Sequence, residues 1–112
     1  MNMTKLKNTL QKSTVRYLVY RDKEDKAWYA VGLELNIVRA GDSALEALLS
    51  LFEAIEGYIE SAREIKAVNV LNQKPIEKYE IMWDEFVTSK TKESLDRARE
   101  IYTRGELSLG HA

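Results

Sequence analysis

The amino-acid sequence predicts an α+β fold: a three-stranded antiparallel meander, a covering helix, a fourth strand and a C-terminal helix. Three observations favour it. Residues 15–40 alternate β-branched, aromatic and polar side chains, which is typical of strands. A strong helix-start signal follows at residues 41–46, and the only proline, Pro75, separates this helix from the later elements.

Residues 15–21 form the first expected strand, with two faces that alternate along the chain: Val15, Tyr17 and Val19 on one, Arg16, Leu18 and Tyr20 on the other. The charged residues 22–26 cannot enter a core, so they are expected to form a hairpin loop. Residues 27–33 and 34–40 are expected to be the second and third strands. Short connections between short strands favour an antiparallel meander.

The helix is expected over residues 44–63. Ser43 and Glu46 form a capping box, in which their side chains accept hydrogen bonds from backbone amides that the helix leaves unpaired. A stripe at helical spacing should cover the sheet: Leu45, Leu48, Leu49, Phe52, Ile55 and Ile59. We expect Leu49 and Phe52 at the centre of this core, so that Phe52→Ala costs about 3–5 kcal/mol of stability.

The later elements follow from shorter patterns. Residues 66–71 either extend the helix or begin an irregular segment, and residues 79–83 are expected to form the fourth strand because Tyr79, Ile81 and Trp83 alternate. Residues 91–103 are expected to form the second helix, ended by Gly105, with residues 106–112 frayed. The chain of 112 residues fits one domain, 1–112.

Composition excludes several classes of protein. The chain has no cysteine, which rules out disulfides, iron–sulfur clusters and thiol chemistry. No run of apolar residues approaches a signal peptide or a membrane span, so a cytoplasmic location is expected. Residues 31–64 carry seven acidic side chains against two basic ones. This acidic middle disfavours nucleic acid and suits a basic protein partner, although a solvated helix face is the plain alternative.

Candidate catalytic groups are few. Asp22, Glu24 and Asp25 are the densest acidic group, but a mobile hairpin tip is a poor place for a metal, and an ordinary charged turn explains them better. His111 is the only histidine and lies next to the chain end. Gly41 precedes a helix N-terminus that could hold an anion, but Asp42 and Ser43 already occupy it. No catalytic, cofactor-binding or metal-binding residue is predicted, and the chain is not expected to be an enzyme.

Aromatic side chains are concentrated on the first two strands: Tyr17, Tyr20, Trp28 and Tyr29. With Arg16 and Arg21 beside them they resemble a stacking platform for single-stranded RNA. Half of them must nevertheless face the covering helix. A core and subunit contact therefore explain these residues better than RNA does.

The ordered segments together resemble the HicB-like antitoxins of type II toxin–antitoxin systems over residues 15–62. They are Tyr17-Leu18-Val19-Tyr20, Glu24-Asp25-Lys26-Ala27-Trp28-Tyr29-Ala30, Leu33-Glu34-Leu35-Asn36-Ile37-Val38, Gly41-Asp42-Ser43-Ala44-Leu45-Glu46-Ala47-Leu48 and Ala54-Ile55-Glu56-Gly57-Tyr58-Ile59. The resemblance implies a truncated ribonuclease H-like fold, β-β-β-α-β, in residues 15–83, with residues 84–112 as a C-terminal helical extension. Many relatives carry Pro-Gly-Cys where this chain has Asn36-Ile37-Val38, and residues 74–112 contain no helix-turn-helix.

The resemblance implies protein binding: an antitoxin, or an orphan relative, that covers the active site of a small basic HicA-type toxin ribonuclease and assembles as a homodimer or tetramer. The expected partner-binding residues are Trp28, Tyr29, Glu53, Glu56 and Glu60. One alternative is a DNA-binding regulator that contacts phosphates through the C-terminal helix. Its basic residues are Lys90, Lys92, Arg97, Arg99 and Arg104, and three acidic residues, Glu93, Asp96 and Glu100, largely cancel their field. A residual nuclease is the other alternative.

Overall fold

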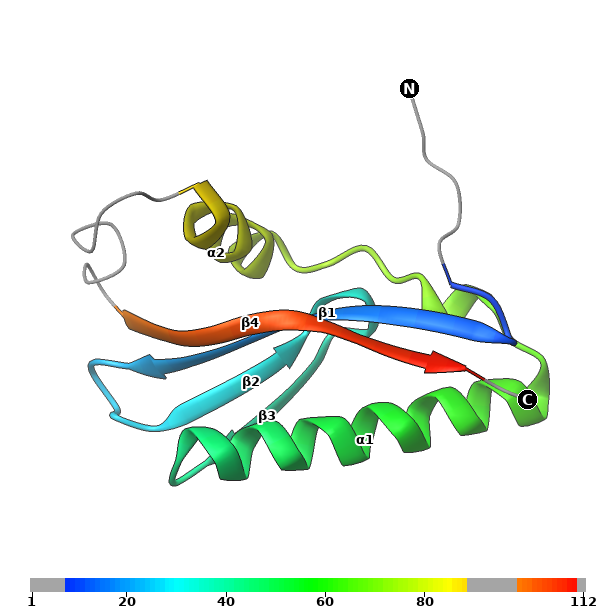
Figure 1. Cartoon of the computed structure of the whole chain (residues 1–112), viewed down its shortest axis with the longest axis horizontal. Helices are drawn as coiled ribbons and strands as arrows, with labels where there is room; N and C mark the ends of the chain where they lie inside the picture. The colour runs from blue at the N-terminus through cyan, green and yellow to red at the C-terminus, as the bar shows by residue number, and fades with distance from the viewer. Residues whose placement is uncertain (1–7, 89–98, 111–112) are drawn as a thin grey trace.

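The fold is a four-stranded antiparallel sheet with one helix on each face (Figure 1). The computed structural model describes residues 8–88 and 99–110. The strands are β1 (Lys12–Asp22), β2 (Trp28–Gly32), β3 (Ile37–Gly41) and β4 (Arg99–Gly110), in the sheet order β3-β2-β1-β4. The two α-helices are α1 (Ala44–Ile65) and α2 (Glu77–Thr88). The α+β class is as predicted.

The hairpin of β1 and β2 pairs Tyr17 with Gly32 at one end and Arg21 with Trp28 at the other. The expected strands at residues 15–21 and 27–33 are confirmed with shifted bounds. Asp22 closes the turn, because its Oδ1 accepts a hydrogen bond from the Glu24 amide at 2.8 Å. The alternation of the two faces of β1 also holds, since Val15 and Val19 pack with α1 while Leu18 and Tyr20 pack with α2.

The third strand begins later than expected. Leu33–Leu35 form a short 3-10 helix instead of extending β2 and β3. Asn36 then takes a left-handed conformation (φ 55°), which asparagine tolerates better than most residues. Its side chain donates to the Lys74 carbonyl (3.1 Å) and accepts from the Ile76 amide (3.3 Å). The turn is therefore tied to the segment that leads into α2.

Helix α1 begins where the capping residues predict. Ser43 Oγ accepts from the Glu46 amide at 3.1 Å, and Glu46 Oε1 accepts from the Asp42 amide at 2.6 Å. Both members of the predicted capping box thus accept hydrogen bonds from backbone amides at this helix start. The helix ends at Ile65, and Lys66 (φ 57°) caps it.

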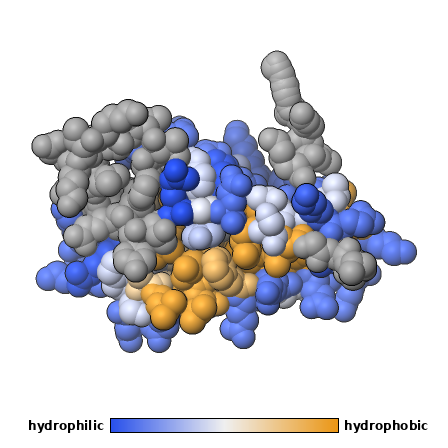
Figure 2. Space-filling view, in the orientation of Figure 1, coloured by the Kyte–Doolittle hydropathy of each residue, from blue (hydrophilic) through white to orange (hydrophobic). Residues whose placement is uncertain are grey.

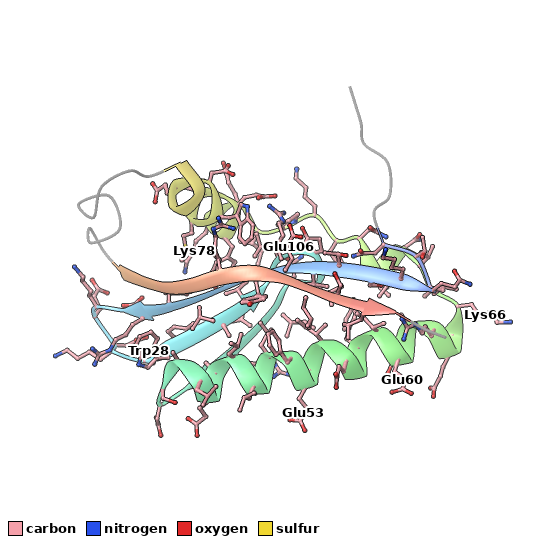
Figure 3. The ribbon with its side chains drawn as sticks, in the orientation of Figure 1. Trp28, Glu53, Glu60, Lys66, Lys78 and Glu106 are labelled. Carbon is pink, nitrogen blue, oxygen red and sulfur yellow. The ribbon has the colours of Figure 1, made fainter. Side chains whose placement is uncertain are left out.

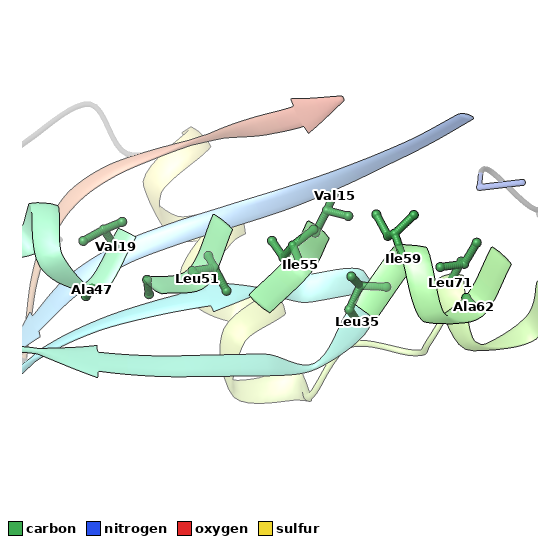
Figure 4. Packing of buried hydrophobic residues seen from close by; sticks show 10 residues of the cluster. Val15, Val19, Leu35, Ala47, Leu51, Ile55, Ile59, Ala62 and Leu71 are labelled. Carbon is green, nitrogen blue, oxygen red and sulfur yellow. The ribbon is translucent and has the colours of Figure 1, made fainter. Parts of the chain in front are cut away.

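The buried face of α1 differs from the predicted one. The residues that point into the sheet are Ala47, Leu51, Ile55, Ile59 and Ala62 (Figure 4). Leu49 is 57% exposed, so its place at the core centre was wrong, and Phe52 is only partly buried, edge-on to Tyr17 at 5.2 Å. The reason is close approach: a Cβ at Gly41 would lie 2.8 Å from the Ala47 backbone nitrogen. The small side chain of Ala47 faces the sheet there, whereas Leu45 and Leu49 turn outward.

Residues 79–83 are not the fourth strand; they lie in α2. Tyr79, Met82 and Trp83 are three and four residues apart, which puts them on one helix face. They pack on Leu18, Tyr20 and other residues of the sheet face opposite α1, whereas Ile81 is 49% exposed. A strand would have buried Ile81 with its alternating neighbours.

The predicted C-terminal helix is also wrong where the structure describes it. Residues 91–98 lie outside the described residues, but residues 99–103 begin β4, and residues 106–110, expected to be frayed, continue it. Gly105 does not end a helix: it pairs with Tyr17, and a Cβ there would lie 2.6 Å from Tyr17 Oη. Leu107 and Leu109 alternate with polar residues, which is a strand pattern in a segment that was expected to be frayed.

The element order is therefore β-β-β-α-α-β instead of β-β-β-α-β. Residues 84–88 finish α2 and residues 99–110 form a strand, so the described part of residues 84–112 is not a helical extension. A single helix between β3 and the next strand would bring that strand back parallel to β3 and β1. The second helix reverses the direction once more, and β4 pairs antiparallel with β1.

Candidate protein-binding surface

The outer side of α1 is acidic. The helix has five glutamates and one arginine. Glu53, Glu56 and Glu60 are all exposed, and Glu53 and Glu60 project away from the sheet (Figure 3). These three residues lie on the solvent side of the helix, as the sequence predicted.

Two exposed leucines lie on the same side of α1. Leu45 is 63% exposed and Leu49 57% exposed. Their spacing from Glu56 and Glu60, in steps of four and seven residues, places all four on one stripe of the helix. Figure 2 shows apolar side chains gathered on this face of the molecule, where α1 and β4 lie. We call Leu45, Leu49, Glu53, Glu56 and Glu60 the α1 outer surface.

A small hollow connects this surface to β4. It has a volume of about 230 Å³ and is lined by Glu56, Ile59, Glu60, Arg63 and Leu109. Arg63 Nε donates to the Leu10 carbonyl at 2.6 Å. Its Nη2 is buried and has no hydrogen-bond partner within residues 8–88 and 99–110. The hollow thus brings two carboxylates and the Arg63 guanidinium beside the apolar side chains of Ile59 and Leu109.

Trp28 and Tyr29 are separated by the sheet. Trp28 packs partly buried on the α1 side, with the Arg21 guanidinium 6.0 Å from its ring centroid. Tyr29 lies on the α2 side, stacked on Tyr20 at 5.4 Å. The structure therefore brings Trp28 to the same side as the carboxylates and places Tyr29 on the other.

The same division weakens the RNA-platform alternative. Tyr17 and Trp28 pack against the α1 core, while Tyr20 and Tyr29 pack with α2. A stacking platform needs several aromatic rings on one open face, and each face here is covered by a helix. The aromatic residues act mainly in the core, as the sequence favoured.

The acidic turn holds itself together by hydrogen bonds. Asp25 Oδ1 accepts from the Ala27 amide at 2.9 Å, and Asp25 Oδ2 accepts from Tyr29 Oη at 2.6 Å. The Tyr29 hydrogen bond, followed by the Ala27 amide, lowers the pKa of Asp25. The same hydrogen bond raises the pKa of Tyr29. Across the described residues, no three His, Cys, Asp or Glu side chains are grouped so as to hold a metal ion.

An ion-pair cluster on the α2 side was missed by the sequence analysis. Arg16 Nε donates to Glu34 at 2.6 Å, and its two terminal nitrogens donate to the Glu80 carboxylate at 2.9 and 3.0 Å. The guanidinium groups of Arg16 and Arg104 lie over the Trp83 ring, 5.2 and 5.1 Å from its centroid. Burial acts to lower the pKa of Arg16, but the hydrogen bonds and charges of Glu80 and Glu34 outweigh it and raise that pKa further above its already high value.

This cluster ties α2 to the sheet and leaves the Arg16 charge matched by carboxylates. The sequence did hold a signal for it: Arg16 shares a strand face with Leu18 and Tyr20, so a charge had to sit beneath any covering element. Which carboxylates would meet it depended on the fold. The two glutamates lie 18 and 64 residues further along the chain.

A second hollow lies beside β3. It measures about 570 Å³ and is lined by residues of β3, of the preceding turn and of α1: Asn36, Ile37, Val38, Arg39, Ala54, Gly57, Tyr58 and Ser61. Arg39 is its only charged residue. Its lining contains no cluster of acidic or basic side chains of the kind that catalysis requires.

Comparison of the chain with family models, with curated proteins and with solved structures finds no match. Among the helices that the structure describes, none is both long and apolar enough to cross a membrane.

Proposed function

We propose that this chain is a HicB-like antitoxin, or an orphan relative, that works by binding a small basic HicA-type toxin ribonuclease and covering its active site. The observation that carries the proposal is the α1 outer surface, where two exposed leucines adjoin three exposed carboxylates. Exposed large apolar side chains beside charge are a mark of interaction surfaces. A cytoplasmic, non-catalytic role belongs to the same proposal.

The order of the first four elements supports the relation to the HicB-like family. Residues 12–65 run β-β-β-α, as the resemblance implies. The extra helix α2 and the antiparallel β4 depart from β-β-β-α-β. The ribonuclease H-like relation is therefore proposed for residues 12–65 alone.

The two kinds of residue on the α1 outer surface have different roles in this proposal. A ribonuclease must be positively charged where it holds phosphate, so the carboxylates would attract that face and speed encounter. Exposed ion pairs contribute only about 0–1 kcal/mol each. Leu45 and Leu49 would therefore provide most of the affinity, by leaving water when the partner binds.

The regulator alternative loses part of its basis. It required a C-terminal helix, but Arg99 and Arg104 lie on β4, and the Arg104 guanidinium stacks on Trp83. The remaining basic residues of that alternative lie outside the described residues. No observation favours DNA over a protein partner.

Surface plasmon resonance against a small basic HicA-type ribonuclease, sought first among the neighbouring genes, tests the proposal. Replacing Glu53, Glu56 and Glu60 by Lys should slow association and flatten its salt dependence, while Leu45→Ala with Leu49→Ala should mainly speed dissociation. A matched control replaces Glu24, Glu77 and Glu85, exposed carboxylates of the turn and of α2, by Lys. Equal effects of the two triple variants would show that net charge matters and this surface does not.

A further inference from the structure

Strand β4 is a long unpaired edge of the sheet. It pairs with β1 along Lys12–Asp22, and no strand of the described chain lies on its other side. The opposite edge, β3, has only five residues, whereas β4 has twelve. An edge strand of this length offers a row of free backbone donors and acceptors to another strand.

Strand β4 carries two opposite charges that can pair with those of a second copy of the strand. Arg104 and Glu106 are exposed and flank Gly105, on the side of the strand that faces α2, since Arg104 stacks on Trp83. In an antiparallel pair centred on Gly105, Arg104 of each copy lies opposite Glu106 of the other. Opposite charges in such cross-strand positions stabilise the pair, and like charges destabilise it.

No register of two β4 strands overlaps further than this one. In an antiparallel pair, directly opposite residues lie on the same face of the sheet, so the two-fold axis of a symmetric pair passes through a residue. Centring on Gly105 pairs residues 100–110, and centring on Arg104 pairs residues 99–109, an overlap of the same length. Centring on Arg104 or Glu106 would place two arginines or two glutamates face to face. The pairing of β4 with β1 is regular over residues 103–110 and shifts only at the bulge between Val19 and Tyr20, so Gly105 and its two charged neighbours lie within the regular stretch.

Apolar surface lies on the same side of the molecule. In Figure 2 the β4 edge faces the viewer, and apolar side chains gather beneath it towards α1. The apolar residues of β4 on the α1 side are Leu107 and Leu109, both partly buried against the core. A copy that pairs with β4 approaches this face, so the contact extends beyond backbone hydrogen bonds.

We propose that two copies of the chain join through β4, antiparallel about Gly105, into one continuous sheet of twice four strands. Arg104 and Glu106 set the register through two equivalent ion pairs across the two-fold axis. Stacking on Trp83 uses the face of the Arg104 guanidinium, and pairing with a carboxylate uses its edge. The interface rests on the β4 edge and is independent of the proposed toxin partner.

Analytical ultracentrifugation of charge-reversal variants tests this interface. The unaltered chain should dimerise at tens of micromolar. Arg104→Glu or Glu106→Arg alone puts like charges opposite each other and should weaken the dimer about tenfold or more. An equimolar mixture of the two variants restores both ion pairs, so dimers should return. Lys66→Glu, an exposed reversal at the far end of α1 (Figure 3), should leave dimerisation unchanged.

A crosslink provides a second readout if the reversals disturb folding. The chain has no cysteine, so Arg104→Cys combined with Glu106→Cys should give a disulfide-linked dimer under mild oxidation. A monomeric unaltered chain, a mixture that stays monomeric, or absence of the crosslink would overturn the proposal. The α1 variants Glu53→Lys, Glu56→Lys and Glu60→Lys should dimerise normally, so failure of the toxin proposal would not be mistaken for failure of this one.

Discussion

The two faces of the sheet are held by different forces. On the α1 face, the helix buries aliphatic side chains against β1, β2 and β3. On the α2 face, a smaller apolar cluster around Leu18 and Met82 is reinforced by the Arg16 ion pairs and by Trp83. The first kind of packing can be predicted from periodicity in the sequence, whereas the second depends on which distant residues meet.

The largest expected effect is on the α1 face. Ile55→Ala should lower the free energy of unfolding by about 2–5 kcal/mol, because Ile55 is fully buried and truncation leaves a cavity. Leu49→Ala should cost less than about 1 kcal/mol, because its side chain is 57% exposed. Urea denaturation measures both. Similar losses at the two positions would mean that the helix is rotated from the orientation described.

The next effect concerns the α2 face. Arg16→Gln should cost roughly 1–3 kcal/mol, because it leaves the carboxylates of Glu34 and Glu80 without their main partner. In double-mutant cycles, coupling of Arg16 to Glu34 should exceed its coupling to Glu80, since the Glu34 side chain is 19% exposed and that of Glu80 is 37% exposed. A stronger coupling of Arg16 to Glu80 than to Glu34 would contradict this expectation and would show that the contact with α2 contributes more to stability.

The smallest effect lies at the exposed turn that joins β1 to β2. The pKa of Asp25 is lowered by Tyr29, so its contribution to stability is present above the ordinary carboxyl pKa and is lost as pH falls through the lowered value. The pKa of Tyr29 is raised, so its contribution is present below the ordinary tyrosine pKa and is lost as pH rises through the raised value.

Tyr29→Phe should therefore raise the pKa of Asp25 towards the ordinary value, measured by NMR titration of its carboxyl carbon. Lys23→Gln, a neutralisation in the same turn, serves as a control for a general change of charge. An Asp25 pKa that does not move in Tyr29→Phe would show that the hydrogen bond is absent in solution.

Local signals predicted the first half of the fold well. The capping box of Ser43 and Glu46 located the start of α1, and the alternation in β1 assigned Val15 and Leu18 to opposite faces correctly. These signals succeed because they depend on neighbours in the chain. The phase of α1 was wrong because Ala47 and Ala62 did not count as core residues, although close contact with the sheet favours small side chains there.

The second half of the fold could not be read in the same way. Tyr79, Ile81 and Trp83 alternate as a strand would, while Tyr79, Met82 and Trp83 also fit a helix, and only the sheet beneath them decides. At residues 99–103, pairing with β1 overrides helical spacing, and the same pairing orders residues 106–110, which were expected to be frayed. Of the predicted site, Trp28 and the three glutamates share the α1 side, but Tyr29 lies on the other face because neighbouring strand residues alternate.

Capture of a ribonuclease by the α1 outer surface is tested most directly by titrating RNA cleavage. A small basic HicA-type ribonuclease, sought first among the neighbouring genes, is assayed on a fluorescent RNA while the chain is added in steps. Cleavage should stop at a stoichiometric amount of the unaltered chain. The Leu45→Ala, Leu49→Ala variant should need at least about tenfold more, whereas the control with Lys at positions 24, 77 and 85 should behave as the unaltered chain. Undiminished cleavage in excess chain, or equal inhibition by the leucine variant, would contradict the account.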